Sequence, residues 1–263
     1  MSFNSQHWYG RDGSSAYGST LRDARKVGLV PSVTTIDKVI AAPQLTDWMV
    51  QQALDAALTL PRMDGESLDA FKVRALDDSR RQAREAAEKG SALHDALEVG
   101  ICADGQRWYS AELGPHVGAV RAALLQHFGK QSWVCESSFA HPLGFGGKCD
   151  LHAPGFVVDF KSKPRIEDGK KYGYDNHVRQ LAAYAVGFGM VAESVQDTEP
   201  GQAVGDWEHL TLANLFVGIE DAKVAVHIWK PAQAVKGWQQ FRAALSLWKA
   251  LNNFDSAFAR EAA

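Results

Sequence analysis

Apolar residues recur at intervals of three and four through the first half of the chain, which is the spacing of one helix face. Val117, Val120, Leu124 and Phe128 follow this spacing and predict a helix over 112–128. Three further amphipathic runs predict helices, and the boundary between the last two is expected near Gly90. These runs cover residues 45–58, 67–90 and 91–99.

The pattern changes after residue 130. Short apolar-rich runs predict three strands, and Ala153-Pro154-Gly155 is a turn signal that joins the last two as a hairpin. A helix, a second pair of strands and a C-terminal helix that can break near Asn252 are expected after them. The strands cover 133–140, 146–152, 156–161, 210–219 and 223–229, and the helices cover 176–190 and 232–262.

This order of elements predicts the α/β class, with a mixed central sheet and a helical N-terminal part. Residues 1–30 are polar and rich in Gly and Ser, and we expect an irregular arm there. We expect residues 31–263 to form a single domain, with a helical part over 45–130 and the sheet with its helices over 131–263. A polar loop is expected over 191–206.

Composition narrows the protein class. With 46% hydrophobic and 22% charged residues, the chain resembles an ordinary globular protein, which excludes disordered, collagen-like and coiled-coil classes. The longest nearly apolar stretch, 181–192, is shorter than the roughly 20 residues that span a bilayer. The start of the chain lacks the pattern of a signal peptide. We therefore expect no membrane association.

Three widely spaced cysteines, Cys102, Cys135 and Cys149, argue against a disulfide framework and against a four-thiolate zinc or iron–sulfur site. They suggest a reducing, cytoplasmic location. The formal net charge is −3, from 28 Lys and Arg against 31 Asp and Glu. A protein that wraps nucleic acid indiscriminately is usually strongly basic, so any contact with a polyanion must be local here.

The predicted hairpin carries the most informative polar residues. Alternation along the strand places Asp159 and Lys161 on the same face, and the hairpin can bring Asp150 opposite them. Two carboxylates beside an ammonium are costly unless a cation bridges the acids. Mg²⁺ commonly binds through one or two carboxylates, so this pattern predicts metal-assisted cleavage of a phosphodiester. The alternative is that both aspartates are surface residues of a polar sheet face.

Two pairs of helical residues complete a motif set. His94 and Glu98 share one helix face, as do Gln180 and Tyr184. Together with the hairpin they form an ordered series that resembles the RecB-like branch of the PD-(D/E)XK nuclease superfamily, which includes phage and mitochondrial exonucleases. The series is Gly90-Ser-Ala-Leu-His94, Gly146-Gly-Lys-Cys-Asp150, Asp159-Phe-Lys161 and Gln180-Leu-Ala-Ala-Tyr184.

The resemblance covers about residues 31–190. It implies a restriction-endonuclease-like core with a mixed central sheet flanked by helices. It also implies that His94, Asp150 and Asp159 bind the metal, together with the backbone carbonyl of Phe160. One or two ions of Mg²⁺ or Mn²⁺ are expected, and an imidazole ligand favours Mn²⁺.

The remaining implied roles belong to catalysis. Lys161 would be the catalytic lysine, Gln180 would touch the attacking water or the DNA backbone, and Tyr184 would support it. Glu136 occupies the position of an acid that some relatives use around a second metal, although it can equally be an exposed strand residue. The family's usual Gly-Thr is Gly-Ser here, and its iron–sulfur cysteines are absent.

Basic and aromatic residues follow the hairpin and predict a nucleic-acid surface. Lysine and arginine can neutralise phosphates, and tyrosine rings can stack on unpaired bases. The candidates are Lys163, Arg165, Lys170, Lys171, Tyr172 and Tyr174, and the hydroxyls of Ser32 and Thr34 can reach phosphate or instead cap and turn the chain. No base-reading helix or zinc finger is recognisable, so contacts independent of DNA sequence are expected.

The resemblance implies a metal-dependent exonuclease acting on DNA ends or single strands, in phage or bacterial recombination, repair or replication. A partner protein from such a pathway is also implied. One alternative is a structure-selective endonuclease of the same fold. Another is a catalytically silent relative that only binds nucleic acid.

Overall fold

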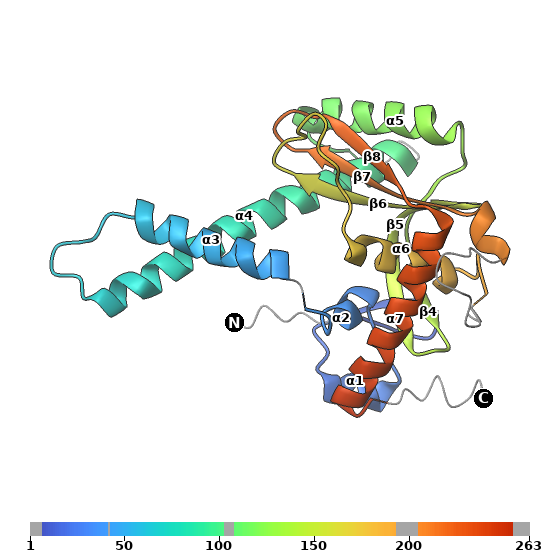
Figure 1. The fold of residues 1–263 in the computed structure, drawn as a ribbon, viewed down its shortest axis with the longest axis horizontal. Coiled ribbons are helices and arrows are strands. Elements are labelled where there is room, and N and C mark those ends of the chain that lie inside the picture. The colour runs from blue at the N-terminus through green and yellow to red at the C-terminus, as the bar shows by residue number, and fades with distance from the viewer. Residues whose placement is uncertain (1–6, 42, 103–107, 193–204, 255–263) are drawn as a thin grey trace. The chain divides into compact units, whose positions relative to one another are not determined.

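The computed structural model describes residues 7–41, 43–102, 108–192 and 205–254, and its largest sheet has five strands (Figure 1). The strand order is β4-β5-β6-β7-β8, with β6 and β7 parallel and the other neighbours antiparallel. The strands are β4 Val134–His141, β5 Phe145–Ala153, β6 Phe156–Lys163, β7 Thr211–Gly218 and β8 Val224–Ile228. These strands confirm the mixed sheet expected from the sequence.

Helices cover both faces of this sheet. α5 (Gly114–Phe128) packs on β7 and β8, and α6 (Asp175–Gly187) packs on β5, β6 and β7 from the other side (Figure 1). α6 also forms the crossover from β6 to β7, because a tight turn cannot join parallel strands. β7 is buried along nearly its whole length, which accounts for its apolar sequence and confirms the α/β class.

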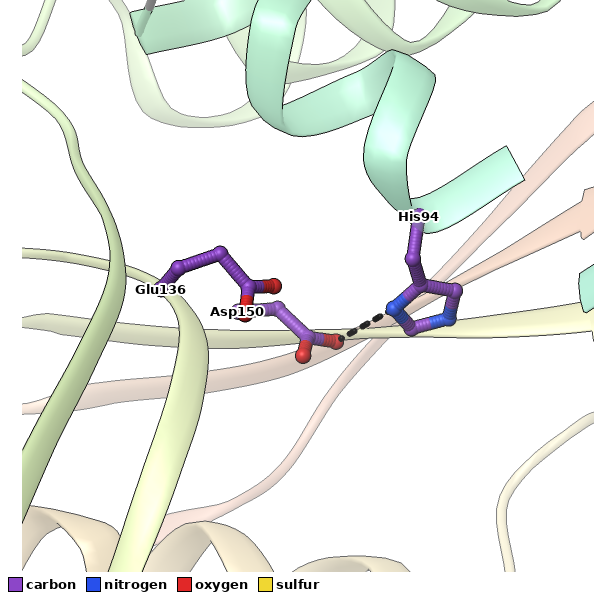
Figure 2. A group of neighbouring side chains, drawn as sticks. All are labelled: His94, Glu136 and Asp150. Carbon is purple, nitrogen blue, oxygen red and sulfur yellow. Dashed lines mark ion pairs between the residues drawn. The ribbon is translucent and has the colours of Figure 1, made fainter. Parts of the chain in front are cut away.

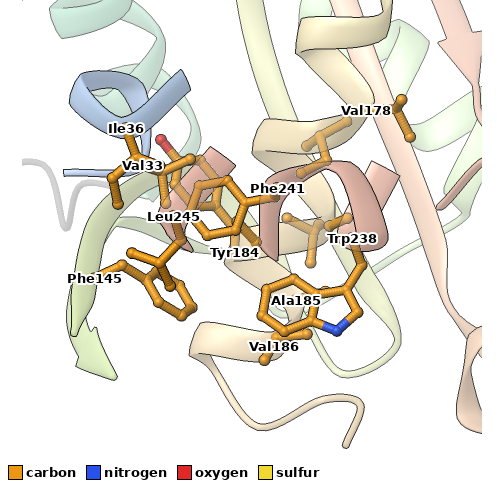
Figure 3. Close-up of a cluster of buried hydrophobic side chains, with 14 of the residues drawn as sticks. Val33, Ile36, Phe145, Val178, Tyr184, Ala185, Val186, Trp238, Phe241 and Leu245 are labelled. Atoms are coloured by element: carbon orange, nitrogen blue, oxygen red, sulfur yellow. The ribbon is translucent and has the colours of Figure 1, made fainter. Parts of the chain in front are cut away.

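The main core lies among α2 (Val33–Asp37), α6 and α7 (Pro231–Asn252), against one face of the sheet (Figure 3). Phe145 of β5 is central to it, with its ring 5.1 Å from that of Phe241 and 6.0 Å from that of Trp238. Aromatic pairs of this kind contribute about 0.5–1.5 kcal/mol beyond their burial. This core fixes α6 on the sheet.

The N-terminal segment is ordered, so the expectation of an irregular arm is wrong for residues 7–30. Trp8 is fully buried, and its ring packs against Trp248 and Phe254 from the other end of the chain. Strands of two or three residues are too short to show periodicity, and their apolar partner lies far away in sequence. The elements are β1 His7–Tyr9, β2 Ser15–Tyr17, α1 Leu21–Val27 and β3 Val30–Pro31, with strand order β2-β1-β3.

α4 is one continuous helix from Leu68 to Cys102, so the expected boundary near Gly90 is wrong. Glycine in a helix costs about 1 kcal/mol relative to alanine, but it does not block the backbone hydrogen bond as proline does. Gly90 is buried, as are Leu93 and Leu97 on the next turns. Packing of this face outweighs the low helix propensity of one residue.

The chain forms two compact units, residues 1–40 with 94–263, and residues 41–93. The smaller unit contains α3 (Pro43–Thr59) and the first part of α4. Within it, Arg74 binds the Glu66 carboxylate through two nitrogens at 2.8 and 2.9 Å. The observed division differs from the expected one, because residues after 93 belong with the sheet rather than with the preceding helices.

Cys102 and Cys135 form a disulfide that joins the end of α4 to β4, with 6.0 Å between their Cα atoms. The argument against a disulfide framework did not foresee this bond, because sequence spacing does not reveal that two cysteines 33 residues apart lie side by side. Cys149 is free and buried. The expected cytoplasmic location therefore loses the support that it drew from unpaired thiols.

The last described helix, α7, ends at Asn252, and Asn253 caps it in a left-handed conformation with φ of 46°. Residues 255–263 of the expected C-terminal helix, most of the expected loop over 191–206, and residues 1–6 lie outside the described part of the chain. Two short 3₁₀ helices span Ala111–Leu113 and Gly205–His209. Within the described residues, no helix combines the length and apolarity needed to cross a bilayer.

Candidate active site

Asp150 reaches β6 through its side chain. The β5–β6 ladder ends at the pair Leu151 and Val158. Beyond this pair, Asp150 Oδ2 accepts a hydrogen bond from the backbone N–H of Phe160 at 2.7 Å. A carboxylate thus bridges the two strands next to the last backbone pair. The hairpin brings Asp150 to the strand that carries Asp159, as the sequence predicts.

A row of polar contacts leads from β6 to α6. Lys161 Nζ lies 2.7 Å from Asp159 Oδ2 and donates to Gln180 Oε1 at 3.1 Å. Gln180 Nε2 in turn donates to the hydroxyl of Tyr184 at 2.8 Å. Gly147 makes room for this tyrosine, since a Cβ at that position would lie 2.6 Å from the ring. Four predicted site residues from two elements thus form a continuous chain of contacts, from Asp159 through Lys161 and Gln180 to Tyr184.

His94 approaches the same spot from α4. Its Nδ1 lies 3.5 Å from Asp150 Oδ2. Its ring meets that of Phe160 edge-on, with 6.1 Å between the centroids. The side chain is mostly buried but not fully enclosed, with 29% of it exposed. His94 thus lies beside the carboxylate that it was predicted to accompany.

Glu136 of β4 completes a group of ligand-type side chains with His94 and Asp150 (Figure 2). One nitrogen or oxygen from each of the three lies within 4.8 Å of the others. Glu136 has a φ of 53°, a conformation that non-glycine residues seldom adopt and that recurs at functional sites. Its carboxylate also forms an ion pair with Lys148. Glu136 is therefore drawn into the site rather than exposed on the strand.

Asp159, which the resemblance implies as a metal ligand, is not part of this three-residue group. Its Oδ2 contacts Lys161 and also accepts a hydrogen bond from Asn214 Nδ2 at 2.9 Å. The structure thus brings Asp150 and Asp159 to adjacent positions, with one beside His94 and the other beside a lysine. A role for the Phe160 carbonyl stays a prediction.

Burial and neighbouring charges shift the pKa values of the two aspartates in opposite directions. Burial raises the pKa of Asp159, and the charge of Asp150 adds to it, so the net shift is upward although Lys161 lowers it. Burial also raises the pKa of Asp150, but His94, the charge of Lys161 and the N–H of Phe160 together outweigh burial, so the net shift is downward. A buried carboxylate and a half-buried one at adjacent positions form a region of negative potential suited to a cation.

Burial acts on the pKa values of the cationic groups in the opposite direction, but the neighbouring acids reverse its effect. Burial lowers the pKa of Lys161, but the charges of Asp159 and Asp150 outweigh it, and the net shift is upward. Burial likewise lowers the pKa of His94, and its contact with Asp150 reverses the sign. Lys161 is therefore held as an ammonium at neutral pH. The site combines two acids, one lysine and one imidazole in a partly buried setting.

Only some of the residues that were expected to contact nucleic acid are exposed. Tyr174 is 43% exposed, and the ammonium of Lys163 lies 5.7 Å from the centre of its ring. Tyr172 is buried and stacks on Phe216, so the expectation that it offers an open ring for a base is wrong. Its hydroxyl instead accepts the backbone N–H of Glu167.

The other candidates have mixed surroundings. Lys171 is exposed, while exposed Arg165 and Lys170 form ion pairs with Glu220 and Glu167 respectively. Ser32 is buried, and its hydroxyl caps α2 by accepting the N–H of Thr35. This observation favours the capping role for Ser32. Thr34 is exposed, with its hydroxyl 3.1 Å from that of Ser32.

Sequence reasoning missed Asn214 and Trp229. Asn214 lies directly opposite Asp159 in the parallel ladder, and the indole N–H of Trp229 donates to its Oδ1 at 2.8 Å. The sequence signal that could have identified Asn214 is that it is a lone amide within the otherwise apolar residues 212–218. A buried polar residue needs a hydrogen-bond partner, so such a residue indicates a polar neighbour on the next strand.

Comparison with models of protein families gives no match, and comparison with curated proteins gives none either. Among solved structures, the chain matches one titled "Crystal structure of SSO0001". The two are 15% identical, the match covers 76% of this chain and 86% of the other, and the TM-score is 0.28. A score this low carries no argument about fold or function.

Proposed function

We propose that this protein is a metal-dependent DNA exonuclease that hydrolyses phosphodiester bonds from DNA ends. The observation that carries the proposal is the convergence of His94, Asp150, Asp159, Lys161 and Gln180, which come from α4, β5, β6 and α6. Two acids, a lysine and an imidazole that perturb one another's pKa values are typical of functional sites. The ordered motif series that resembles the RecB-like branch supports the same reaction.

The residues present fit a divalent cation. His94, Glu136 and Asp150 offer one nitrogen and two carboxylates within reach of one another. Oxygen donors suit Mg²⁺, and the imidazole adds a preference for Mn²⁺. When bound, such an ion polarises a phosphoryl oxygen and lowers the pKa of a coordinated water. Asp159 borders this group and can contribute a further carboxylate oxygen.

The chain's own residues supply the rest of the chemistry. Asp159 orients the Lys161 ammonium, which can stabilise the negative charge that grows on the phosphate during attack. Gln180 accepts from Lys161 and is held by Tyr184, so its amide is positioned at the edge of the site. A positioned ammonium and amide need no reorganisation when charge develops, which is the basis of such stabilisation.

DNA binding follows from local positive charge rather than from the chain as a whole. Lys163 ends the strand that carries Lys161, and Lys171 and Tyr174 follow it closely in sequence. Burial and the neighbouring charges of Lys170 and Lys161 lower the pKa of Lys163, so positive charge is concentrated near this side chain. Contacts of lysine side chains with phosphates recognise the DNA backbone rather than its bases, so we propose activity independent of base sequence.

Digestion of end-labelled single- and double-stranded oligonucleotides, with Mg²⁺, Mn²⁺ or a chelator, tests the proposal. We expect cleavage with either ion, none with the chelator, and no loss of closed circular DNA. Asp150→Asn should abolish cleavage, and Asp168→Asn, which alters an exposed carboxylate paired with Lys223, should leave it unchanged. Cleavage that persists with a chelator or in Asp150→Asn would contradict the proposed site, and cleavage of closed circles would indicate an endonuclease.

A further inference from the structure

Asn214 is a fully buried residue on β7, and its side-chain amide contacts Asp159 of the proposed site from the neighbouring strand. It lies opposite Asp159 in the ladder and donates from Nδ2 to Asp159 Oδ2 at 2.9 Å. Its other side-chain atom, Oδ1, accepts from the indole N–H of Trp229 at 2.8 Å. Trp229 is itself 6% exposed. The amide is therefore enclosed between an indole and a carboxylate.

The indole decides which way the amide faces. An indole N–H can only donate, so the atom that meets it must be the carbonyl oxygen of Asn214. The NH₂ group is then turned toward Asp159, and it can only donate to the carboxylate. Trp229 thus converts an amide that could face either way into a fixed donor.

This donor determines how Asp159 presents its two oxygens. Asn214 Nδ2 and Lys161 Nζ both contact Oδ2, at 2.9 and 2.7 Å. Among the described residues, none donates a hydrogen bond to Oδ1. One oxygen is held by two donors, and the other is left for a ligand. Rotation of the carboxylate would break both contacts.

Packing alone does not account for this arrangement. β7 is otherwise apolar, and asparagine is disfavoured in strands. An aliphatic residue would fill the position without the desolvation cost of a buried amide. The amide is satisfied only because Trp229 supplies a donor and Asp159 supplies an acceptor at matching positions. The pattern resembles the outer contacts that orient the ligands of metal centres.

We propose that Asn214, fixed by Trp229, is a positioning residue that holds the Asp159 carboxylate so that its free oxygen can coordinate the divalent cation. This inference rests on the proposed function, because it assigns Asp159 to the ion of that site. Loss of the amide or of the indole N–H should weaken binding of the ion, even where the protein folds normally.

The test is the dissociation constant of Mn²⁺ for the full-length, metal-free protein, measured by isothermal titration calorimetry. Trp229→Phe keeps an aromatic ring and removes the N–H, and Asn214→Leu removes the amide at similar volume. Each should raise the dissociation constant about tenfold or more. Trp248→Phe is the matched control, because its ring packs on Trp8 and Phe254. It should leave the constant unchanged.

Thermal unfolding of the metal-free variants separates positioning from folding. If Asn214→Leu does not fold, Trp229→Phe decides the question alone. An unchanged Mn²⁺ constant in folded Trp229→Phe, with wild-type binding intact, overturns the inference and leaves the proposed function standing. Wild-type protein that binds no Mn²⁺ overturns both. A weaker constant in Trp229→Phe but not in Trp248→Phe supports the inference.

Discussion

Nδ1 of His94 lies 3.5 Å from Oδ2 of Asp150, although the first residue is on a helix and the second on a strand. The same carboxylate oxygen accepts the backbone N–H of Phe160 at 2.7 Å. Asp150 is thereby the point at which α4, β5 and β6 meet. The proposed chemistry depends on this meeting point.

Replacing the imidazole should weaken metal binding. His94→Ala removes one of three clustered donors, and we expect the Mn²⁺ dissociation constant to rise by about tenfold or more, as for other changes at metal centres. Calorimetric titration of the metal-free protein measures this. His209→Ala, at an exposed histidine, is the control and should bind as wild type does. Equal affinity in the two variants would exclude His94 from the ligand set.

Removing the lysine should slow cleavage without preventing DNA binding. Lys161→Ala deletes the ammonium beside Asp159, and loss of one preorganised donor to a developing charge costs about 10²–10³ in kcat. Single-turnover cleavage and fluorescence anisotropy with a labelled oligonucleotide measure the two properties separately. Lys223→Ala, at an exposed ion pair, should change neither. Cleavage by Lys161→Ala at the wild-type rate would remove this lysine from the mechanism.

The close contact of β5 with α6 should make Gly147 sensitive to substitution. In Gly147→Ala the new Cβ would lie 2.6 Å from Cε1 of Tyr184, and relief of such overpacking costs about 1–3 kcal/mol. Gly118→Ala is the control, because its Cβ meets open space on a helix, where alanine stabilises by up to about 1 kcal/mol. Urea unfolding compares them. Equal stability of the two variants would show that the strand does not approach the tyrosine closely.

Acid should destabilise the protein through His177. Burial and the charges of Lys161 and Lys163 lower the pKa of His177 from 6.5 to about 3. Because the folded state disfavours the proton, this contribution to stability is present above pH 6.5 and is lost as the pH falls toward 3. The slope for one proton is at most about 1.4 kcal/mol per pH unit.

His177→Gln removes the titrating group and keeps a side chain that can accept the N–H of Tyr174, as Nδ1 of His177 does. Free energies of unfolding measured between pH 7 and pH 4, an interval set by the roughly 6.5 pKa of free histidine, should fall less steeply in this variant. The absolute stability at neutral pH can differ without affecting the comparison of slopes. Parallel curves for the two proteins would contradict the assignment.

Local sequence signals were sufficient to predict the β5–β6 hairpin. Short apolar-rich runs indicate its strands, Pro154 and Gly155 mark the turn, and the spacing of Asp159 and Lys161 fixes their common face. The structure places Asp150 beside them because the tight turn sets the register, in which Ala153 pairs with Phe156 and Leu151 with Val158. These features depend on residues near one another in sequence, which is why they could be predicted.

Features that depend on distant residues could not be predicted in this way. The disulfide between Cys102 and Cys135 and the burial of Trp8 require partners that only the fold supplies. The inclusion of Glu136 depends on a backbone conformation that its sequence does not signal. Asn214 was visible as a polar residue in an apolar strand, but its partner was not.

The most direct test of the proposed metal site is anomalous X-ray diffraction from crystals soaked in Mn²⁺. We predict an anomalous peak within bonding distance of side-chain atoms of His94 and Asp150, with Glu136 or Asp159 alongside. The same soak of Asp150→Asn crystals should lose the peak. Absence of a peak at this position in wild-type crystals that bind Mn²⁺ elsewhere would contradict the account.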